Sequence, residues 1–266
     1  MTPTRPGTLN ATRLGSGQPL LLVHGLGASW ASWRPILDDL ARSREVIAID
    51  LPGFGDSAPL EGEVTIERLT DAVAEYLRAE GLQDVDTVGS SMGARMVLEL
   101  ARRGIGGSTV ALDPGGFWSP SELRLFHLSL RASLPLVLRL QGVMPQLMGS
   151  PVGRTALLSQ FSAAPWSLSK DVALGEMRSF AKATSLYDAF DALVNGPLQQ
   201  GAPQGTPPGR VTIGWGRQDR VTLPRQAARA MALFPDAELH WFERCGHFPF
   251  WDQPSETVKL ILERTG

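Results

Sequence analysis

The stretch Val88-Gly89-Ser90-Ser91-Met92-Gly93-Ala94 decides the fold of this chain. It contains the pattern Gly-x-Ser-x-Gly, with Ser91 at its centre. A β-branched and apolar run precedes the pattern and apolar residues at helical spacing follow it, so we expect a strand, a sharp turn and a helix. Such a turn lifts the serine hydroxyl clear of the sheet, which makes Ser91 a candidate nucleophile. The pattern is short, and an ordinary strand-to-helix turn would also produce it.

Strand and helix patterns alternate on both sides of this turn. We expect strands at 8–13, 19–23, 45–50, 85–90, 109–112, 211–215 and 237–242, and helices at 31–42, 65–80, 92–103, 223–234 and 256–264. The Gly-rich turn at 15–18 suggests that the first two strands form an opening hairpin. The alternation predicts an α/β fold with a mostly parallel, doubly wound sheet.

The alternation breaks after Asp113. Between 117 and 195 only helical patterns occur, and we expect Pro135 to interrupt the first of them. The Pro- and Gly-rich stretch 196–209 reads as a linker back to the sheet. We therefore predict a core made of 1–116 and 210–266, with a helical insert at 117–209 placed before the last two strands.

Composition excludes several classes of protein. The chain has 266 residues, of which 43% are hydrophobic and 20% charged, as in an ordinary soluble domain. A formal net charge of −2 and the lack of a basic run argue against nucleic-acid binding. The single cysteine, Cys245, rules out an intramolecular disulfide and a cysteine-built metal site, and we expect it to be a small buried filler. No signal-peptide pattern or membrane-length apolar run is visible, so we expect a cytoplasmic protein without a membrane partner.

Two more polar residues follow expected strands. Asp219 comes after the strand at 211–215, and His247 stands in Gly246-His247-Phe248-Pro249 after the strand at 237–242. Catalytic groups in open α/β sheets lie beyond the carboxyl ends of the strands. Ser91, Asp219 and His247 follow the chain order nucleophile, acid, base. The alternative interpretation is that Asp219 is a surface aspartate and His247 a structural histidine.

Two loops complete the expected site. The loop His24-Gly25-Leu26-Gly27 follows the strand at 19–23. We expect the backbone N–H groups of Leu26 and Met92 to bind the oxyanion of a tetrahedral intermediate. His24 itself is expected to order its loop through hydrogen bonds rather than to transfer protons. The loop at 50–57 reads as a rigid turn without chemistry.

These motifs together resemble the α/β-hydrolase superfamily, in particular the cap-bearing serine hydrolases similar to bacterial esterases and meta-cleavage-product hydrolases. The matching pieces are His-Gly-Leu-Gly at 24–27, Asp-Leu-Pro-Gly-Phe-Gly-Asp-Ser at 50–57, Gly-Ser-Ser-Met-Gly at 89–93, Gly-Arg-Gln-Asp at 216–219 and Gly-His-Phe-Pro-Phe-Trp-Asp-Gln-Pro at 246–254. The resemblance implies the α/β-hydrolase fold, a Ser91-His247-Asp219 triad and a helical cap. It implies no metal ion and no organic cofactor.

One alternative for the acid stays open. Some relatives place it after the strand that precedes the cap, where Asp113 stands. We favour Asp219, because Gly-x-x-Asp after the following strand is the more usual arrangement in this superfamily. The mechanism implied is acyl transfer to Ser91, with His247 as base, followed by hydrolysis of the acyl-enzyme by water.

The insert suggests an apolar pocket for a small-molecule substrate. Its candidate lining residues, together with one from the histidine loop, are Phe117, Trp118, Phe126, Met144, Phe161, Trp166 and Phe248. Each of them would equally serve to pack the cap onto the core. We expect hydrolysis of a small, moderately apolar carboxylic ester, with carbon–carbon or lactone hydrolysis as the alternative. A slow-turnover small-molecule receptor would keep the same triad, and the sequence leaves the oligomeric state open.

Overall fold

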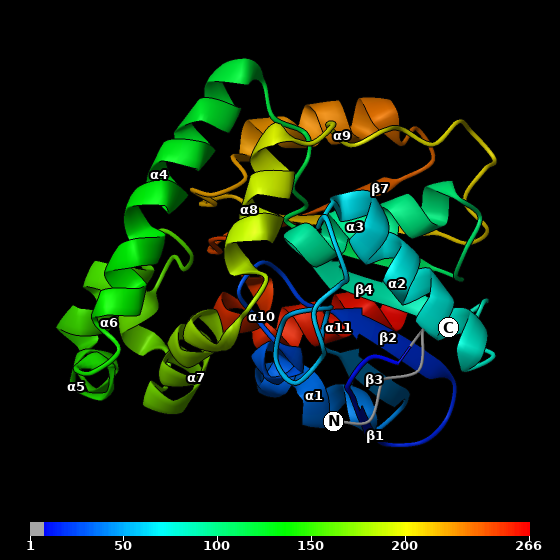
Figure 1. Cartoon of the computed structure of the whole chain (residues 1–266). Coiled ribbons are helices and arrows are strands. Elements are labelled where there is room, and N and C mark those ends of the chain that lie inside the picture. Colours follow the sequence, from blue (N-terminus) through cyan, green and yellow to red (C-terminus); the bar gives the residue numbers. More distant parts are fainter. Residues whose placement is uncertain (1–7) are drawn as a thin grey trace.

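A seven-stranded sheet lies at the centre of the computed structural model, which describes residues 8–266 (Figure 1). The strands are β1 (Ala11–Leu14), β2 (Pro19–Val23), β3 (Glu45–Ile49), β4 (Asp86–Ser90), β5 (Thr109–Leu112), β6 (Val211–Gly216) and β7 (Glu238–Phe242). Their order across the sheet is β1-β3-β2-β4-β5-β6-β7, and every neighbouring pair except β1 and β3 is parallel. The inner strands are buried along almost their whole length, as strands covered on both faces must be.

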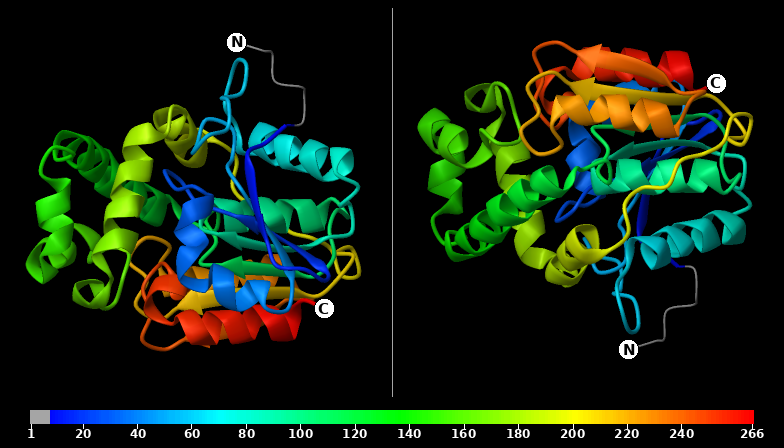
Figure 2. Two further views of the ribbon diagram at one scale, coloured as in Figure 1. Left: turned by 90° about the horizontal axis from the view of Figure 1, so that it is seen from below. Right: turned by 90° about the horizontal axis from the view of Figure 1, so that it is seen from above.

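Helices cover both faces of this sheet (Figure 2). Helices α1 (Arg34–Ala41), α10 (Pro249–Asp252) and α11 (Pro254–Arg264) pack together, and α2 (Ile66–Ala79) packs on α3 (Met92–Arg102). Helix α9 (Ala227–Leu233) connects β6 to β7, after the short 3-10 turn η3 (Pro224–Gln226). The predicted α/β architecture, mostly parallel and doubly wound, is confirmed.

The prediction that the first two strands form an opening hairpin is wrong. Strand β1 pairs antiparallel with β3, from Ala11 opposite Ile49 to Leu14 opposite Val46, and β3 separates it from β2. The burial of the two strands explains the order. Four of the five β3 residues are fully buried, whereas β1 is half-buried and suits the edge of the sheet.

The insert, residues 117–209, is here called the cap. Its helices are α4 (Pro120–Arg139), α5 (Met144–Gly149), α6 (Pro151–Leu158), α7 (Lys170–Lys182) and α8 (Leu186–Asn195), with the 3-10 turn η2 (Pro165–Ser167). In both views of Figure 2, α4 to α7 lie to one side of the core. The absence of strands from 117–195 agrees with the sequence pattern.

The expected break at Pro135 does not occur, because α4 runs through it. Pro135 lies on the exposed face of the helix, and so does Arg131, whose carbonyl loses its usual hydrogen bond there. Water can hydrate that carbonyl. The buried face of Phe126, Leu130 and Leu134 continues unbroken past the proline.

Cap and core meet at a buried carboxyl group. Glu176 of α7 is 4% exposed, and its Oε2 accepts a hydrogen bond from the hydroxyl of Ser32 in the 3-10 turn η1 (Trp30–Trp33) at 2.7 Å. Burial raises the pKa of Glu176 to about 7, because the charged form loses its hydration. The ionised form therefore destabilises the folded state.

Replacing Glu176 by Gln is expected to stabilise the protein at pH 8 by up to about 3 kcal/mol. Because the pKa of Glu176 is higher in the folded than in the unfolded state, folding takes up a proton between pH 4.5 and about 7. The free-energy cost of burying the carboxylate is therefore complete above pH 7 and disappears as the pH falls toward 4.5. The measurement is the unfolding midpoint of Glu176→Gln and wild type across this range. The exposed Glu75→Gln on α2 is the control. An equal gain at every pH would contradict the assignment.

Candidate active site

Ser91 sits in a strained turn between β4 and α3. Its φ of 55° and ψ of −112° lie where side-chain-bearing residues are rare, at a cost of order 1–3 kcal/mol. Two glycines make the turn possible. A Cβ on Gly93 would lie 2.2 Å from the carbonyl oxygen of Val23, and one on Gly89 would lie 2.3 Å from that of Gly93. The structure therefore places Ser91 at the sharp turn that the sequence pattern predicts.

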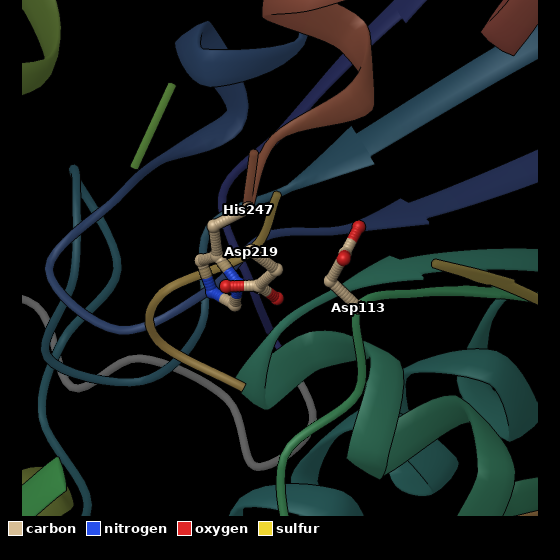
Figure 3. Close-up of side chains that lie close together, drawn as sticks. All are labelled: Asp113, Asp219 and His247. Carbon is tan, nitrogen blue, oxygen red and sulfur yellow. The ribbon is translucent and has the colours of Figure 1, made fainter. Parts of the chain in front are cut away.

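Asp219 and His247, which are 28 residues apart, meet at the carboxyl ends of β6 and β7 (Figure 3). The Nδ1 of His247 lies 2.9 Å from Oδ2 of Asp219, and both side chains are buried. A carboxylate only accepts hydrogen bonds, so Nδ1 carries the proton and Nε2 is left free to accept another. This is the tautomer that a general base requires.

Asp219 is held in place by its own loop. The backbone N–H groups of Val221 and Thr222 donate to its Oδ1 at 2.7 and 3.1 Å. The hydroxyl of Thr222 donates to Oδ2 at 2.6 Å and lies 3.3 Å from Nδ1 of His247. The sequence did not point to a role for Thr222, although its spacing of three residues from an aspartate is typical of a side-chain-to-backbone turn.

Asp113, the alternative acid, lies beside this pair (Figure 3). Its Oδ1 accepts a hydrogen bond from the backbone N–H of Gly216 at 2.8 Å rather than facing the imidazole. Burial first, and then the neighbouring Asp219 carboxylate, raise the pKa of Asp113 well above its ordinary value. The geometry therefore favours Asp219 as the partner of His247, and burial disfavours the ionised form of Asp113.

One ligand atom from each of Asp113, Asp219 and His247 lies within 4.8 Å of the others, a separation that a metal ion could bridge. The hydrogen bonds described above, however, already engage Nδ1 of His247, both oxygens of Asp219 and one oxygen of Asp113. The side chains that could bind a metal ion are therefore engaged in hydrogen bonds instead.

The loop after β2 lies against Ser91. A Cβ on Gly25 would lie 3.1 Å from Cβ of Ser91, so only glycine leaves the approach to the serine open. His24 is buried, its Nε2 accepts the N–H of Leu51 at 3.0 Å, and its Nδ1 donates to the carbonyl of Gly25 at 2.7 Å. Burial lowers the pKa of His24, which keeps this ring neutral. The expected ordering role of His24 is confirmed.

The turn at 50–57 is held by the Asp50 carboxylate, as the sequence predicts. Its Oδ1 accepts the N–H of Trp30 at 2.7 Å, and its Oδ2 accepts the side chain of Asn10 at 2.7 Å and the N–H of Asp56 at 3.0 Å. A Cβ on Gly55 would collide with this carboxylate at 2.2 Å. These bonds fix the turn beside the loop that follows β2.

The structure brings two of the expected substrate-contacting residues next to His247. Phe248 and Phe161 lie 4.9 and 6.5 Å from His247 between ring centroids, and they stack on each other at 5.8 Å. The other expected residues lie elsewhere: Phe117 packs on Phe234, Trp118 on Phe126, Met144 is fully buried, and Trp166 is 55% exposed. Trp166 therefore does not line an enclosed pocket here.

Asp252 ties the cap to the histidine loop. Its carboxylate accepts hydrogen bonds from the hydroxyl of Ser162, from the N–H of Ala163 at 2.8 Å and from the N–H of Gly246 at 2.7 Å. The carbonyl of Phe161 accepts the N–H of His247 at 2.7 Å. Sequence analysis placed Asp252 within a motif but gave it no role, because the partner segment lies about 90 residues away.

Comparison with known proteins agrees with the fold of this chain. The family model described as "Alpha/beta hydrolase family" matches residues 20–260. The chain is 29% identical to 2-hydroxymuconate semialdehyde hydrolase of Pseudomonas sp. (strain CF600), over 93% of this chain and 86% of that protein.

Two solved structures share the fold. A thermophilic esterase from Thermogutta terrifontis is 20% identical, with a TM-score of 0.75 over 96% of this chain and 92% of the esterase. A 2-hydroxy-6-oxo-6-phenylhexa-2,4-dienoate hydrolase from Rhodococcus sp. (strain RHA1) is 23% identical, with a TM-score of 0.75 over 97% of this chain and 96% of that one.

Mutation is expected to distinguish the roles of Asp219 and Asp113. Asp219→Asn should lower kcat/KM by about 10³–10⁴-fold, because an amide stabilises the wrong tautomer of His247 and cannot balance the imidazolium. Asp113→Asn should retain most of the activity, because this carboxyl bonds the N–H of Gly216 rather than His247 and burial already disfavours its ionised form. Steady-state kinetics on one activated ester measure both. If Asp113→Asn lost as much activity as Asp219→Asn, the assignment of the acid would be wrong.

Proposed function

The chain belongs to the alpha/beta hydrolase family, and from that premise we propose that it is a serine hydrolase that cleaves a small, moderately apolar carboxylic ester. The observation that carries the proposal is the buried contact of 2.9 Å between Nδ1 of His247 and Oδ2 of Asp219, at the same end of the sheet as the strained turn of Ser91. This combination supplies a serine, a base with a free Nε2 and an acid that orients the base.

The proposed reaction proceeds through an acyl-enzyme. His247 Nε2 takes the hydroxyl proton of Ser91 while Oγ attacks the ester carbonyl, and the same proton then passes to the leaving alcohol. The backbone N–H groups of Leu26 and Met92 bind the oxyanion; losing one such donor typically costs about 10²–10³ in turnover. Water, deprotonated by His247, then releases the acid and restores Ser91.

The residues around His247 support a substrate with an uncharged, apolar acyl group. Phe161 and Phe248 flank the His247 ring, and Phe161 belongs to the cap. Aromatic walls beside a few fixed polar groups are the usual lining of a site for a small apolar ligand. We therefore propose that the acyl chain packs against these two rings.

Hydrolysis of a carbon–carbon bond is the second candidate. It is favoured by the 29% identical relative, whose name describes a hydrolase of 2-hydroxymuconate semialdehyde. The same nucleophile, base and acid would serve either reaction, and they would also serve the hydrolysis of a lactone. What differs is the charge of the substrate, because a dienoate substrate brings a carboxylate close to the aromatic wall.

The deciding experiment is hydrolysis of p-nitrophenyl esters of rising acyl length by wild type and Ser91→Ala. We expect saturable turnover by wild type, with an optimum at a medium acyl length, and loss of activity in Ser91→Ala because no nucleophile remains. Mass spectrometry of the quenched reaction should show the acyl adduct on wild type only.

A vinylogous 2-hydroxy-6-oxo-dienoate serves as the second substrate in the same assay. Turnover of the dienoate with none of the esters would replace the ester proposal by carbon–carbon hydrolysis. Stoichiometric acylation followed by release far slower than the usual enzyme range of about 1–10³ s⁻¹ would indicate a receptor instead. Equal activity of Ser91→Ala would remove Ser91 from the mechanism.

A further inference from the structure

Helix α4 of the cap presents an apolar stripe to solvent. Leu125, Leu128 and Leu136 are 53%, 63% and 48% exposed, and Ala132 and Pro135 lie between them on the same exposed side. Their spacing of three, four or seven residues keeps them on one helical face. The opposite face is buried, through Phe126, Leu130, Leu134 and Val137. The exposed leucines therefore do not serve the packing of the cap.

Arginines frame this stripe. Arg124, Arg131 and Arg139 are exposed on the same side of α4. The imbalance of charge extends along the cap: residues 123–170 contain four arginines and one lysine, and none of the 27 acidic residues of the chain falls there. The chain as a whole carries a formal net charge of −2, so positive charge is concentrated on this segment. The term cationic stripe is used below for Arg124, Leu125, Leu128, Arg131, Leu136 and Arg139.

Neighbouring parts of the cap add further exposed apolar side chains. Val143 follows α4, Val152 lies in α6 and Trp166 lies in η2, and they are 48%, 78% and 55% exposed. Tryptophan is enriched where one side of a residue is apolar and the other is wet. Several exposed large apolar side chains within one segment are typical of an interaction site.

We propose that the cationic stripe docks on the surface of a lipid bilayer that contains anionic phospholipid. A helix with leucines on its outer face and arginines around them can lie in the plane of the headgroups, with the leucines reaching the acyl chains. Guanidinium groups bind phosphate oxygens through paired hydrogen bonds. Such a surface therefore satisfies both the charge and the apolar character of the stripe.

The charge pattern disfavours a second copy of the chain as the occupant. Two stripes placed face to face would bring arginine against arginine, and residues 123–170 offer no carboxylate to neutralise them. Our sequence analysis expected no membrane partner on the ground that no segment could cross a bilayer. Within residues 8–266 the structure has no helix that is long and apolar enough to span one, but docking on a surface requires no span.

Sedimentation with vesicles tests the proposal on the full chain. We expect binding to phosphatidylcholine vesicles that contain phosphatidylglycerol, weak binding to pure phosphatidylcholine, and loss of binding as salt is raised. Each surface cation strengthens binding to anionic lipid about fivefold, so the triple variant Arg124→Gln, Arg131→Gln, Arg139→Gln should bind roughly a hundredfold more weakly. Leu125→Ser with Leu128→Ser should also weaken binding, with the charge unchanged.

The matched control replaces three exposed arginines outside the cap, Arg42→Gln, Arg78→Gln and Arg244→Gln, which change the net charge equally. Activity on a soluble ester should be the same in the triple variant and wild type, which shows that the variant is folded. Failure of wild type to bind anionic vesicles, or equal loss in the control, would overturn the proposal. So would concentration-dependent self-association that the leucine variants abolish, because a second copy would then be the occupant.

Discussion

The contact between α3 and the end of β2 is the constraint on which the rest of the site depends. The helix begins so close to that strand that a single Cβ at Gly93 would lie 2.2 Å from the carbonyl oxygen of Val23. This approach forces the sharp turn and the unusual φ of 55° at Ser91. It also brings the loop of Gly25 against the serine, where the backbone donors of the proposed oxyanion site would stand. No side chain can be added at Gly93 without moving the turn of Ser91.

Local patterns predicted the secondary structure well and the pairing of strands less well. The apolar strands at 19–23 and 109–112 have the predicted bounds, because buried parallel strands read as continuous apolar runs. The place of β1 depends on β3, which follows some thirty residues later, so the turn between β1 and β2 misled the analysis. Pro135 misled it because the cost of a proline depends on whether water reaches the carbonyl that it leaves unbonded.

The same distinction applies to the site. Ser91, Asp219 and His247 stand in short motifs after strands, and parallel strands bring their carboxyl ends to one edge, so the sequence predicts that all three lie at that edge. The roles of Thr222 and Asp252 emerge only in three dimensions, where one fixes the acid and the other fixes the histidine loop to Ser162 and Ala163 of the cap. The residues that would contact the substrate were the least predictable part. Trp118 and Phe161 are both aromatic cap residues, but only the ring of Phe161 faces His247.

The position of the cap between β5 and β6 also affects the order in which the chain can fold. These strands are hydrogen-bonded neighbours, from Thr109 opposite Val211 to Leu112 opposite Gly214, yet the whole cap separates them in sequence. Closing a loop of about 100 residues costs on the order of 4 kcal/mol of chain entropy beyond a constant term. During synthesis, Ser91 and its strand leave the ribosome long before Asp219 and His247. The first five strands are therefore synthesised before the cap, and the β5 edge has no partner strand until β6 follows.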